Sequence, residues 1–146
     1  MTIPNFDEHG NLPPGIHRAS LDEIVERFIQ PRSLVREERT KHLKKFVQFV
    51  QCFANAIYIN GSYTTSKLSP SDVDILVILP IWIPCQTYEY KYILEVIQNS
   101  DKNHLDLFSY WVGIWQKDLI KEKFIWFTHN RDGKSKGIIR VEYDKK

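Results

Sequence analysis

The segment VDILVIL, residues 73–79, constrains the fold most. Six of its seven residues are aliphatic, and the seventh is Asp74. A short run of this composition predicts a β-strand, and its near-continuous apolar character indicates burial on both faces. Such a strand needs a sheet that other elements cover.

Two helices are expected before this strand. Ser20 to Glu23 (SLDE) matches a capping box, which predicts a helix that runs to about Gln30 and stops at Pro31. A second helix is expected over about 33–55. Its predicted buried face consists of Leu43, Phe46, Val47, Val50 and Phe53.

The remaining elements alternate between strands and helices. Short strands are expected at 56–59, 104–111 and 136–143. Residues 86–100 fit both periods, and we expect a helix because the following strand needs a crossover. Residues 115–127 predict another helix. Its expected apolar face consists of Leu119, Ile120, Phe124, Phe127 and the stem of Lys123.

These elements predict an α/β (α+β) fold, a small mixed β-sheet flanked by helices. The chain has 146 residues, the size of one ordinary domain. We therefore expect a single domain over 1–146, with an N-terminal segment over about 1–19 that forms an ordered arm or turns.

The charge balance gives no clear partner. A net charge of +2 is too weak to indicate nucleic-acid binding by itself. The first half of the second helix carries five cations, for which a solvated face is expected and contact with RNA is the alternative. They are Arg36, Arg39, Lys41, Lys44 and Lys45.

Several features favour a cytoplasmic protein without a membrane span. Cys52 and Cys85 have no metal-ligand spacing, and Cys52 is expected to be a buried thiol. The first ten residues lack the pattern of a signal peptide. The longest apolar run, 73–84, is too short for a span and contains Asp74.

The candidate functional residues lie around the strand expected at 73–79. Asp72 and Asp74 are two residues apart, so both carboxylates are expected on one face, where they could hold Mg²⁺. Gly61 and Ser62 follow the strand at 56–59, and such a turn lets backbone amides and a hydroxyl approach a phosphate. Lys67 could contact a triphosphate or be an exposed loop lysine.

Asp106 is the candidate third carboxylate. It interrupts the strand at 104–111 as Asp74 interrupts the earlier one, and it would face Asp72 and Asp74 if the two strands were neighbours. Three carboxylates that hold two metal ions are typical of phosphoryl or nucleotidyl transfer.

These motifs resemble the signature of the polymerase-beta-like nucleotidyltransferase superfamily, in particular its minimal nucleotidyltransferases. The resemblance covers residues 56–111 and rests on Gly61-Ser62, Asp72-x-Asp74 and a later strand aspartate. It implies that the turn binds the triphosphate and that the carboxylates bind Mg²⁺. Members of toxin–antitoxin systems usually carry an arginine after the Gly-Ser pair, whereas this chain has Tyr63. The flanks, 3–17 and 131–141, also resemble a small bacterial family of unknown activity within that superfamily.

Two functions follow as expectations. The first is Mg²⁺-dependent transfer of a nucleoside monophosphate from a nucleoside triphosphate to a hydroxyl on a protein or RNA acceptor, with Asp106 helping to activate the acceptor. The alternative is a catalytically weak or inactive binding module, antitoxin-like or regulatory, that acts through a partner protein.

Several nearby residues leave two roles open. Tyr63 could stack on a base or pack, Trp111 and Trp115 favour the core over base stacking, and His104 favours a structural role over that of a general base. The segment with Arg131, Lys134 and Lys136 is first a turn, and it could also supply cations to a nucleotide or RNA.

Overall fold

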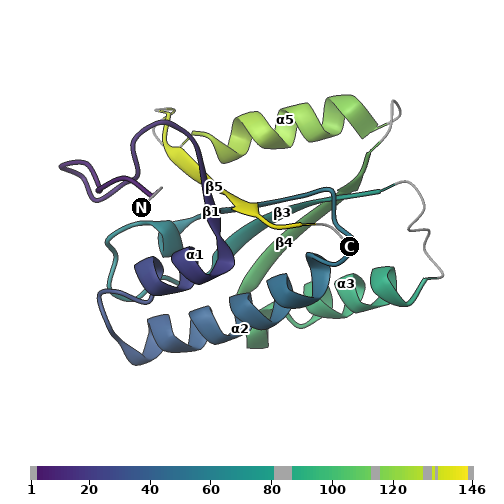
Figure 1. The fold of residues 1–146 in the computed structure, drawn as a ribbon, viewed down its shortest axis with the longest axis horizontal. Helices are drawn as coiled ribbons and strands as arrows, with labels where there is room; N and C mark the ends of the chain where they lie inside the picture. Colours follow the sequence, from purple (N-terminus) through teal and green to yellow (C-terminus); the bar gives the residue numbers. More distant parts are fainter. Residues whose placement is uncertain (1–2, 81–86, 113–115, 130–132, 134, 145–146) are drawn as a thin grey trace.

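The computed structural model describes residues 3–80, 87–112, 116–129, 133 and 135–144. It is a mixed α+β fold, a five-stranded sheet with helices on both faces (Figure 1). The strands are β1 (Gly15–Ser20), β2 (Ala56–Asn60), β3 (Val73–Leu79), β4 (Leu105–Trp111) and β5 (Gly137–Glu142). The helices are α1 (Leu21–Phe28), α2 (Leu34–Val50), the 3₁₀ turn η1 (Ser62–Thr64), α3 (Tyr88–Gln98), α4 (Ser100–Asn103) and α5 (Lys117–Phe127).

The strand order is β1-β5-β2-β3-β4. β2 runs antiparallel to both of its neighbours, whereas β3 and β4 are parallel, as are β1 and β5. The crossover expected between β3 and β4 is present, because α3 and α4 lie between these two strands in the chain. β3 is buried along its length except at Asp74, which confirms the prediction for this segment.

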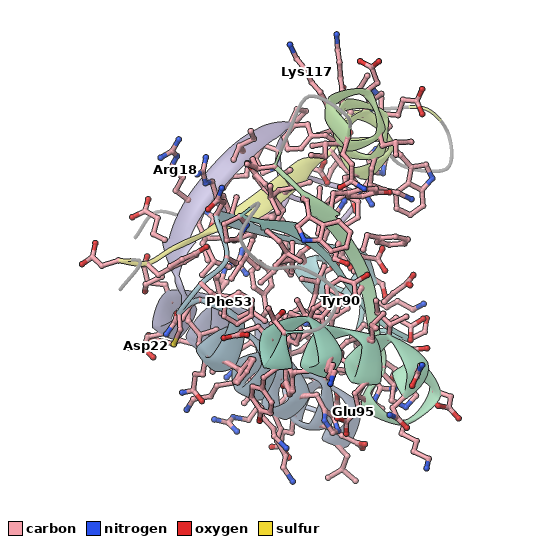
Figure 2. All side chains as sticks on the ribbon, turned by 90° about the vertical axis from the view of Figure 1, so that its right-hand side faces the viewer. Arg18, Asp22, Phe53, Tyr90, Glu95 and Lys117 are labelled. Carbon is pink, nitrogen blue, oxygen red and sulfur yellow. The ribbon has the colours of Figure 1, made fainter. Side chains whose placement is uncertain are left out.

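The helices form two unequal layers. α1, α2 and α3 cover one face of the sheet, and α5 covers the other (Figure 1). Figure 2 shows Phe53 and Tyr90 between the first layer and the sheet, with Lys117 on α5 at the opposite side. The larger core cluster contains all five residues of the face predicted for α2, from Leu43 to Phe53. The smaller one joins Leu76 and Ile78 to Phe127 on α5.

The capping box predicted for α1 is confirmed. The Ser20 hydroxyl accepts from the Glu23 amide, and the Glu23 carboxylate accepts from the Ser20 amide. Within the described ranges, every helix is too short or too polar to cross a lipid bilayer.

Four predictions about single segments are wrong. The expected arm over 1–19 contains strand β1, because residues 15–20 pair with β5 at the other end of the chain. Leu119 is 50% exposed, because α5 turns other side chains toward the sheet. Cys52 is exposed, because α2 ends at Val50 and Cys52 falls in the following turn. Arg36 and Arg39 are buried and belong neither to a solvated face nor to an RNA-binding face, whereas Lys41, Lys44 and Lys45 are exposed, as a solvated face predicts.

Predictions about Cys85, Trp115, Arg131 and Lys134 concern residues outside the described part of the chain.

Candidate active site

The register of two parallel strands brings together the carboxylates of Asp74 and Asp106. β3 and β4 pair with Asp74 directly opposite Asp106. Directly paired residues point to the same face of a sheet, and neighbouring strands lie about 5 Å apart. Here that face is the one beneath α5, because Leu76 and Phe108, two residues further along each strand, pack in its core cluster. β3 and β4 are therefore neighbours, which is the condition under which Asp106 was expected to face the other carboxylates.

The turn after β2 lies against the same carboxylate. Gly61 has φ +89°, a conformation that side chains rarely adopt. A Cβ atom at this position would lie 2.9 Å from Oδ2 of Asp74. The glycine therefore allows both the backbone reversal and the close approach of the turn to the carboxylate. Ser62, half-buried, opens the 3₁₀ turn that follows.

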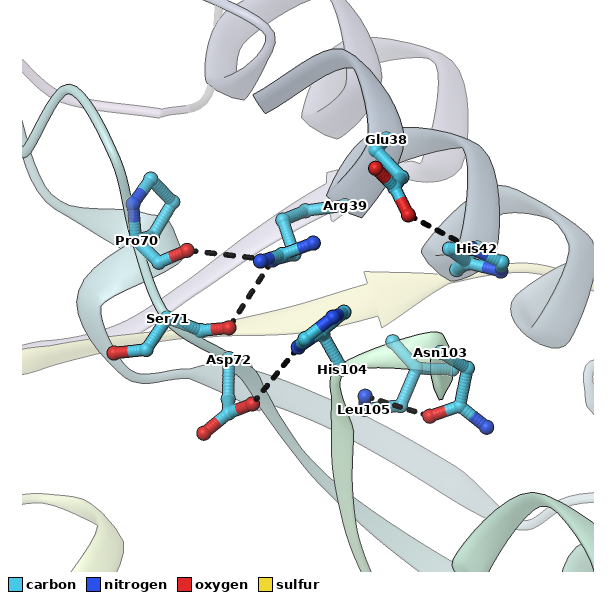
Figure 3. Close-up of polar contacts among 9 residues, drawn as sticks. All are labelled: Glu38, Arg39, His42, Pro70, Ser71, Asp72, Asn103, His104 and Leu105. Atoms are coloured by element: carbon cyan, nitrogen blue, oxygen red, sulfur yellow. Dashed lines mark hydrogen bonds and ion pairs between the residues drawn. The ribbon is translucent and has the colours of Figure 1, made fainter. Parts of the chain in front are cut away.

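Two arginines from α2 hold the loop between Gly61 and Asp72. The Arg36 guanidinium, fully buried, donates to the carbonyl oxygens of Tyr63, Thr65 and Lys67 over 2.6 to 2.9 Å. It also donates to the carbonyl of Phe28. Nε of Arg39 lies 3.3 Å from the carbonyl oxygen of Pro70 and 3.1 Å from that of Ser71 (Figure 3). The loop is thus fixed at both ends by a helix that does not itself line the site.

A cavity of 740 Å³ opens beside the carboxylates. This volume falls in the range of about 300–1,000 Å³ typical of small-molecule sites. All six predicted site residues line it, namely Gly61, Ser62, Lys67, Asp72, Asp74 and Asp106. Its other lining residues are Asn60, Ser71, Ile125, Trp126, His129 and Lys136.

Burial, and then the crowding of like charges, makes ionisation of Asp74 unfavourable. Burial and the nearby charge of Asp106 raise the pKa of Asp74 to about 6, with a smaller contribution from Asp72. Lys136 and Lys123 act in the opposite direction and lower this pKa. A bound cation would relieve this repulsion, since an opposite charge favours the ionised form of a carboxylate.

The pKa of Asp106 is also raised, although its carboxylate is more exposed than that of Asp74. Burial and the charge of Asp72 raise its pKa, while Lys123 and a hydrogen bond with Asp74 lower it. Lys136, half-buried on the cavity wall, has a lowered pKa because burial disfavours its ammonium, although Asp74 partly compensates. The site is therefore a cluster of three carboxylates with two lysines close by.

Asp72 lies at the entrance of β3 and contacts a histidine from the neighbouring strand end. Oδ1 of Asp72 is 3.7 Å from Nδ1 of His104 (Figure 3). His104 has φ +58° and follows α4, where its carbonyl accepts from the amide of Val73. It is not among the residues found to line the cavity. The position of His104 therefore fits a role in orienting the Asp72 carboxylate better than a role in contacting a ligand.

The chain matches the model of one protein family over residues 4–142, a family of unknown function designated DUF6932. The chain belongs to this family. No match was found among curated proteins or solved structures. DUF6932 carries no assigned activity, so the function of this chain has to be inferred from the site itself.

The carboxylates that line this cavity of the DUF6932 chain offer oxygen donors, the type found in magnesium sites. As the described side chains stand, no three His, Cys, Asp or Glu residues are arranged to hold a metal ion. Three carboxylates of the cavity, those of Asp72, Asp74 and Asp106, nevertheless offer oxygen atoms, the donor type that Mg²⁺ prefers. Asn60 adds a further one, because it pairs with Asp74 across β2 and β3 and is 2% exposed. Its Oδ1 has no hydrogen-bond partner among the described residues, whereas its amide nitrogen donates to the carbonyl of Phe127.

Two of the open alternatives are now decided. Tyr63 is fully buried, with its hydroxyl 2.7 Å from that of Thr40, so it packs and cannot stack on a base. Trp111 stacks on Tyr90 with ring centroids 4.8 Å apart, beside the main core. Lys67 is exposed, yet it lines the cavity.

No local motif indicates the residues that α5 contributes to the cavity. Ile125, Trp126 and His129 reach the cavity from the helix end and the residues after it. Their spacing matches an ordinary amphipathic helix, so only the packing of α5 over the sheet identifies them. Asn60 was equally hidden, although its place just before Gly61 was a signal that could have been used.

Proposed function

We propose that this chain is a Mg²⁺-dependent nucleotidyltransferase. It would take a nucleoside monophosphate from a nucleoside triphosphate and attach it to a hydroxyl on a protein or RNA acceptor. The observation that carries the proposal is the pairing of Asp74 with Asp106 on adjacent parallel strands, in one cavity with Asp72 and the Gly61-Ser62 turn. Nucleoside triphosphates and Mg²⁺ are abundant in the cytoplasm, where we expect the protein to act.

Each part of the cavity has a place in this reaction. The backbone and hydroxyl of Gly61-Ser62 would bind the triphosphate, and Lys67 and Lys136 would add positive charge along it. Asp72 and Asp74, with Asp106, would hold Mg²⁺. When bound, the ion supplies charge neutralisation at the phosphate oxygens and acidifies the attacking hydroxyl.

The chemical step is an in-line substitution at the α-phosphorus. The acceptor oxygen forms a bond to this phosphorus, and the bond from the phosphorus to the oxygen that bridges it to the β-phosphate breaks. Pyrophosphate leaves with that oxygen, and the hydroxyl proton passes to the Asp106 carboxylate. The chain contributes mainly positioning and preorganised charge.

The test is equilibrium binding of labelled nucleoside triphosphates with Mg²⁺, followed by transfer of the α-labelled nucleotide to cellular RNA or protein. We expect Mg²⁺-dependent binding by the wild type, and its loss in Asp74→Asn and Asp106→Asn. The exposed Asp144→Asn serves as the matched control. The proposal fails if the wild type binds no triphosphate, or if the two site variants bind as well as the control.

One observation favours the alternative of a binding module without turnover. Arg36, which lies against the loop that follows the phosphate turn, donates to main-chain carbonyls and is fully buried. It therefore offers no charge to a triphosphate, unlike the arginine usual in the minimal enzymes. Triphosphate binding without any transfer, together with co-purification of a partner protein, would support this antitoxin-like or regulatory role.

A further inference from the structure

The cavity has an apolar wall that the carboxylate chemistry does not use. Trp126 and Ile125 line it from the last turn of α5. They are 54% and 53% exposed, although they sit beside a polar site. An aromatic side chain that is exposed on a cavity wall is a candidate contact surface for a ligand.

The Trp126 ring is held in place despite its exposure. Its centroid lies 5.8 Å from that of Phe108, at an interplanar angle of 67°. The ammonium of Lys123 lies 4.4 Å from the same ring and 4.0 Å from the ring of Phe108. Phe108 in turn packs against Phe127 of the smaller core cluster. A braced aromatic surface of this kind loses little conformational entropy when a ligand stacks on it.

We infer that Trp126 is the stacking platform for the nucleobase of the bound nucleoside triphosphate, with Ile125 as its apolar neighbour. This inference rests on the proposed function. The same cavity joins this platform to the phosphate turn, to the carboxylates and to Lys136, so one ligand can touch both walls. A ligand with a flat aromatic group and a polyphosphate matches the two walls, and a nucleoside triphosphate has both.

Stacking on Trp126 also predicts weak discrimination between nucleobases. Every nucleobase has an aromatic face, so recognition through Trp126 tolerates different bases. Loss of one stacked base typically weakens binding by about 5-fold to 150-fold.

The experiment compares two probes on the full-length chain by titration calorimetry in Mg²⁺: ATP, and inorganic tripolyphosphate, which lacks the base and the ribose. The variants are Trp126→Ala, Trp126→Phe and the control Leu119→Ala. Leu119 lies on the same helix, is 50% exposed and is not found among the residues that line the cavity.

We expect Trp126→Ala to weaken ATP binding at least about fivefold and tripolyphosphate binding less than twofold. Trp126→Phe should retain most of the ATP affinity, and Leu119→Ala should change neither probe. The inference is overturned if Trp126→Ala leaves ATP affinity within twofold of the wild type, or if it weakens both probes equally. Wild-type protein that binds neither probe overturns the proposed function, and the inference with it, whereas wild-type binding of both with no effect of Trp126→Ala removes the inference alone.

Discussion

The carboxylate cluster should make the protein less stable than a variant that lacks one of its charges. The pKa of Asp74 rises from the ordinary 3.8 to about 6 in the folded chain. Each pKa unit corresponds to about 1.4 kcal/mol, so the folded state disfavours the charged form of Asp74 by at most about 3 kcal/mol. Asp74→Asn removes this charge at nearly constant shape.

The sign of the effect follows from proton binding. Because the folded pKa lies above the unfolded one, the folded state binds the proton more tightly. The free energy of unfolding of the wild type therefore decreases as pH rises from about 4 through about 6 and levels off above that. Asp74→Asn should lack this decrease. Relative to pH 4, its advantage over the wild type should grow to at most about 3 kcal/mol by pH 7.5.

The assay is urea unfolding of both proteins at a series of pH values from 4 to 8, without divalent ions. Asp144→Asn is again the control, because Asp144 is exposed and is not found among the residues of the cavity. Its pH dependence should match that of the wild type. If Asp74→Asn also follows the wild-type profile across the whole range, the carboxylate is not under electrostatic stress and the reasoning is refuted.

Four further predictions concern the same site. Mg²⁺ should raise the melting temperature of the wild type at pH 7.5 but not that of Asp74→Asn, and equal shifts in scanning calorimetry would contradict a site at Asp74. Gly61→Ala should lower the free energy of unfolding by about 1–3 kcal/mol, because φ is +89° and the new methyl group meets Asp74. An unchanged midpoint of urea unfolding would contradict this. Arg36→Met should cost about 3–5 kcal/mol, since it leaves buried carbonyls without their donor. The exposed Arg32→Met should cost less than about 0.5 kcal/mol, and similar losses would show that the buried contacts contribute little. Lys136→Ala should raise the pKa of Asp74 further above about 6, because the lysine charge lowers this pKa. NMR of the carboxyl carbon measures the pKa, and an unchanged value would contradict the prediction.

The local elements could be predicted because their signals lie within a few residues. The capping box fixed the start of α1, and the aliphatic run gave the bounds of β3. β1 was missed, because it follows a segment rich in Pro and Gly and is stabilised by pairing with β5, far away in sequence. No local pattern reports such a partner.

The cations of α2 show the same limit more sharply. A mixed-charge helix face predicts contact with solvent, which an isolated helix would have. Arg36 is buried instead, because the loop after Gly61 folds over it and offers its carbonyl oxygens. The position of that loop depends on how β2 and β3 pair, not on the sequence around Arg36.

The residue types of the site can be recognised from the amino-acid sequence alone: the glycine turn, the two carboxylates at the start of β3 and a third acid in a later strand. Their types and spacings are local properties of the chain. The positions of Asp106 directly opposite Asp74 and of Trp126 at the same cavity, by contrast, become visible only in the folded chain. Strand order, strand register and the packing of α5 result from the burial of the whole core. A contact between two residues that are distant in sequence therefore cannot be predicted from those two residues alone.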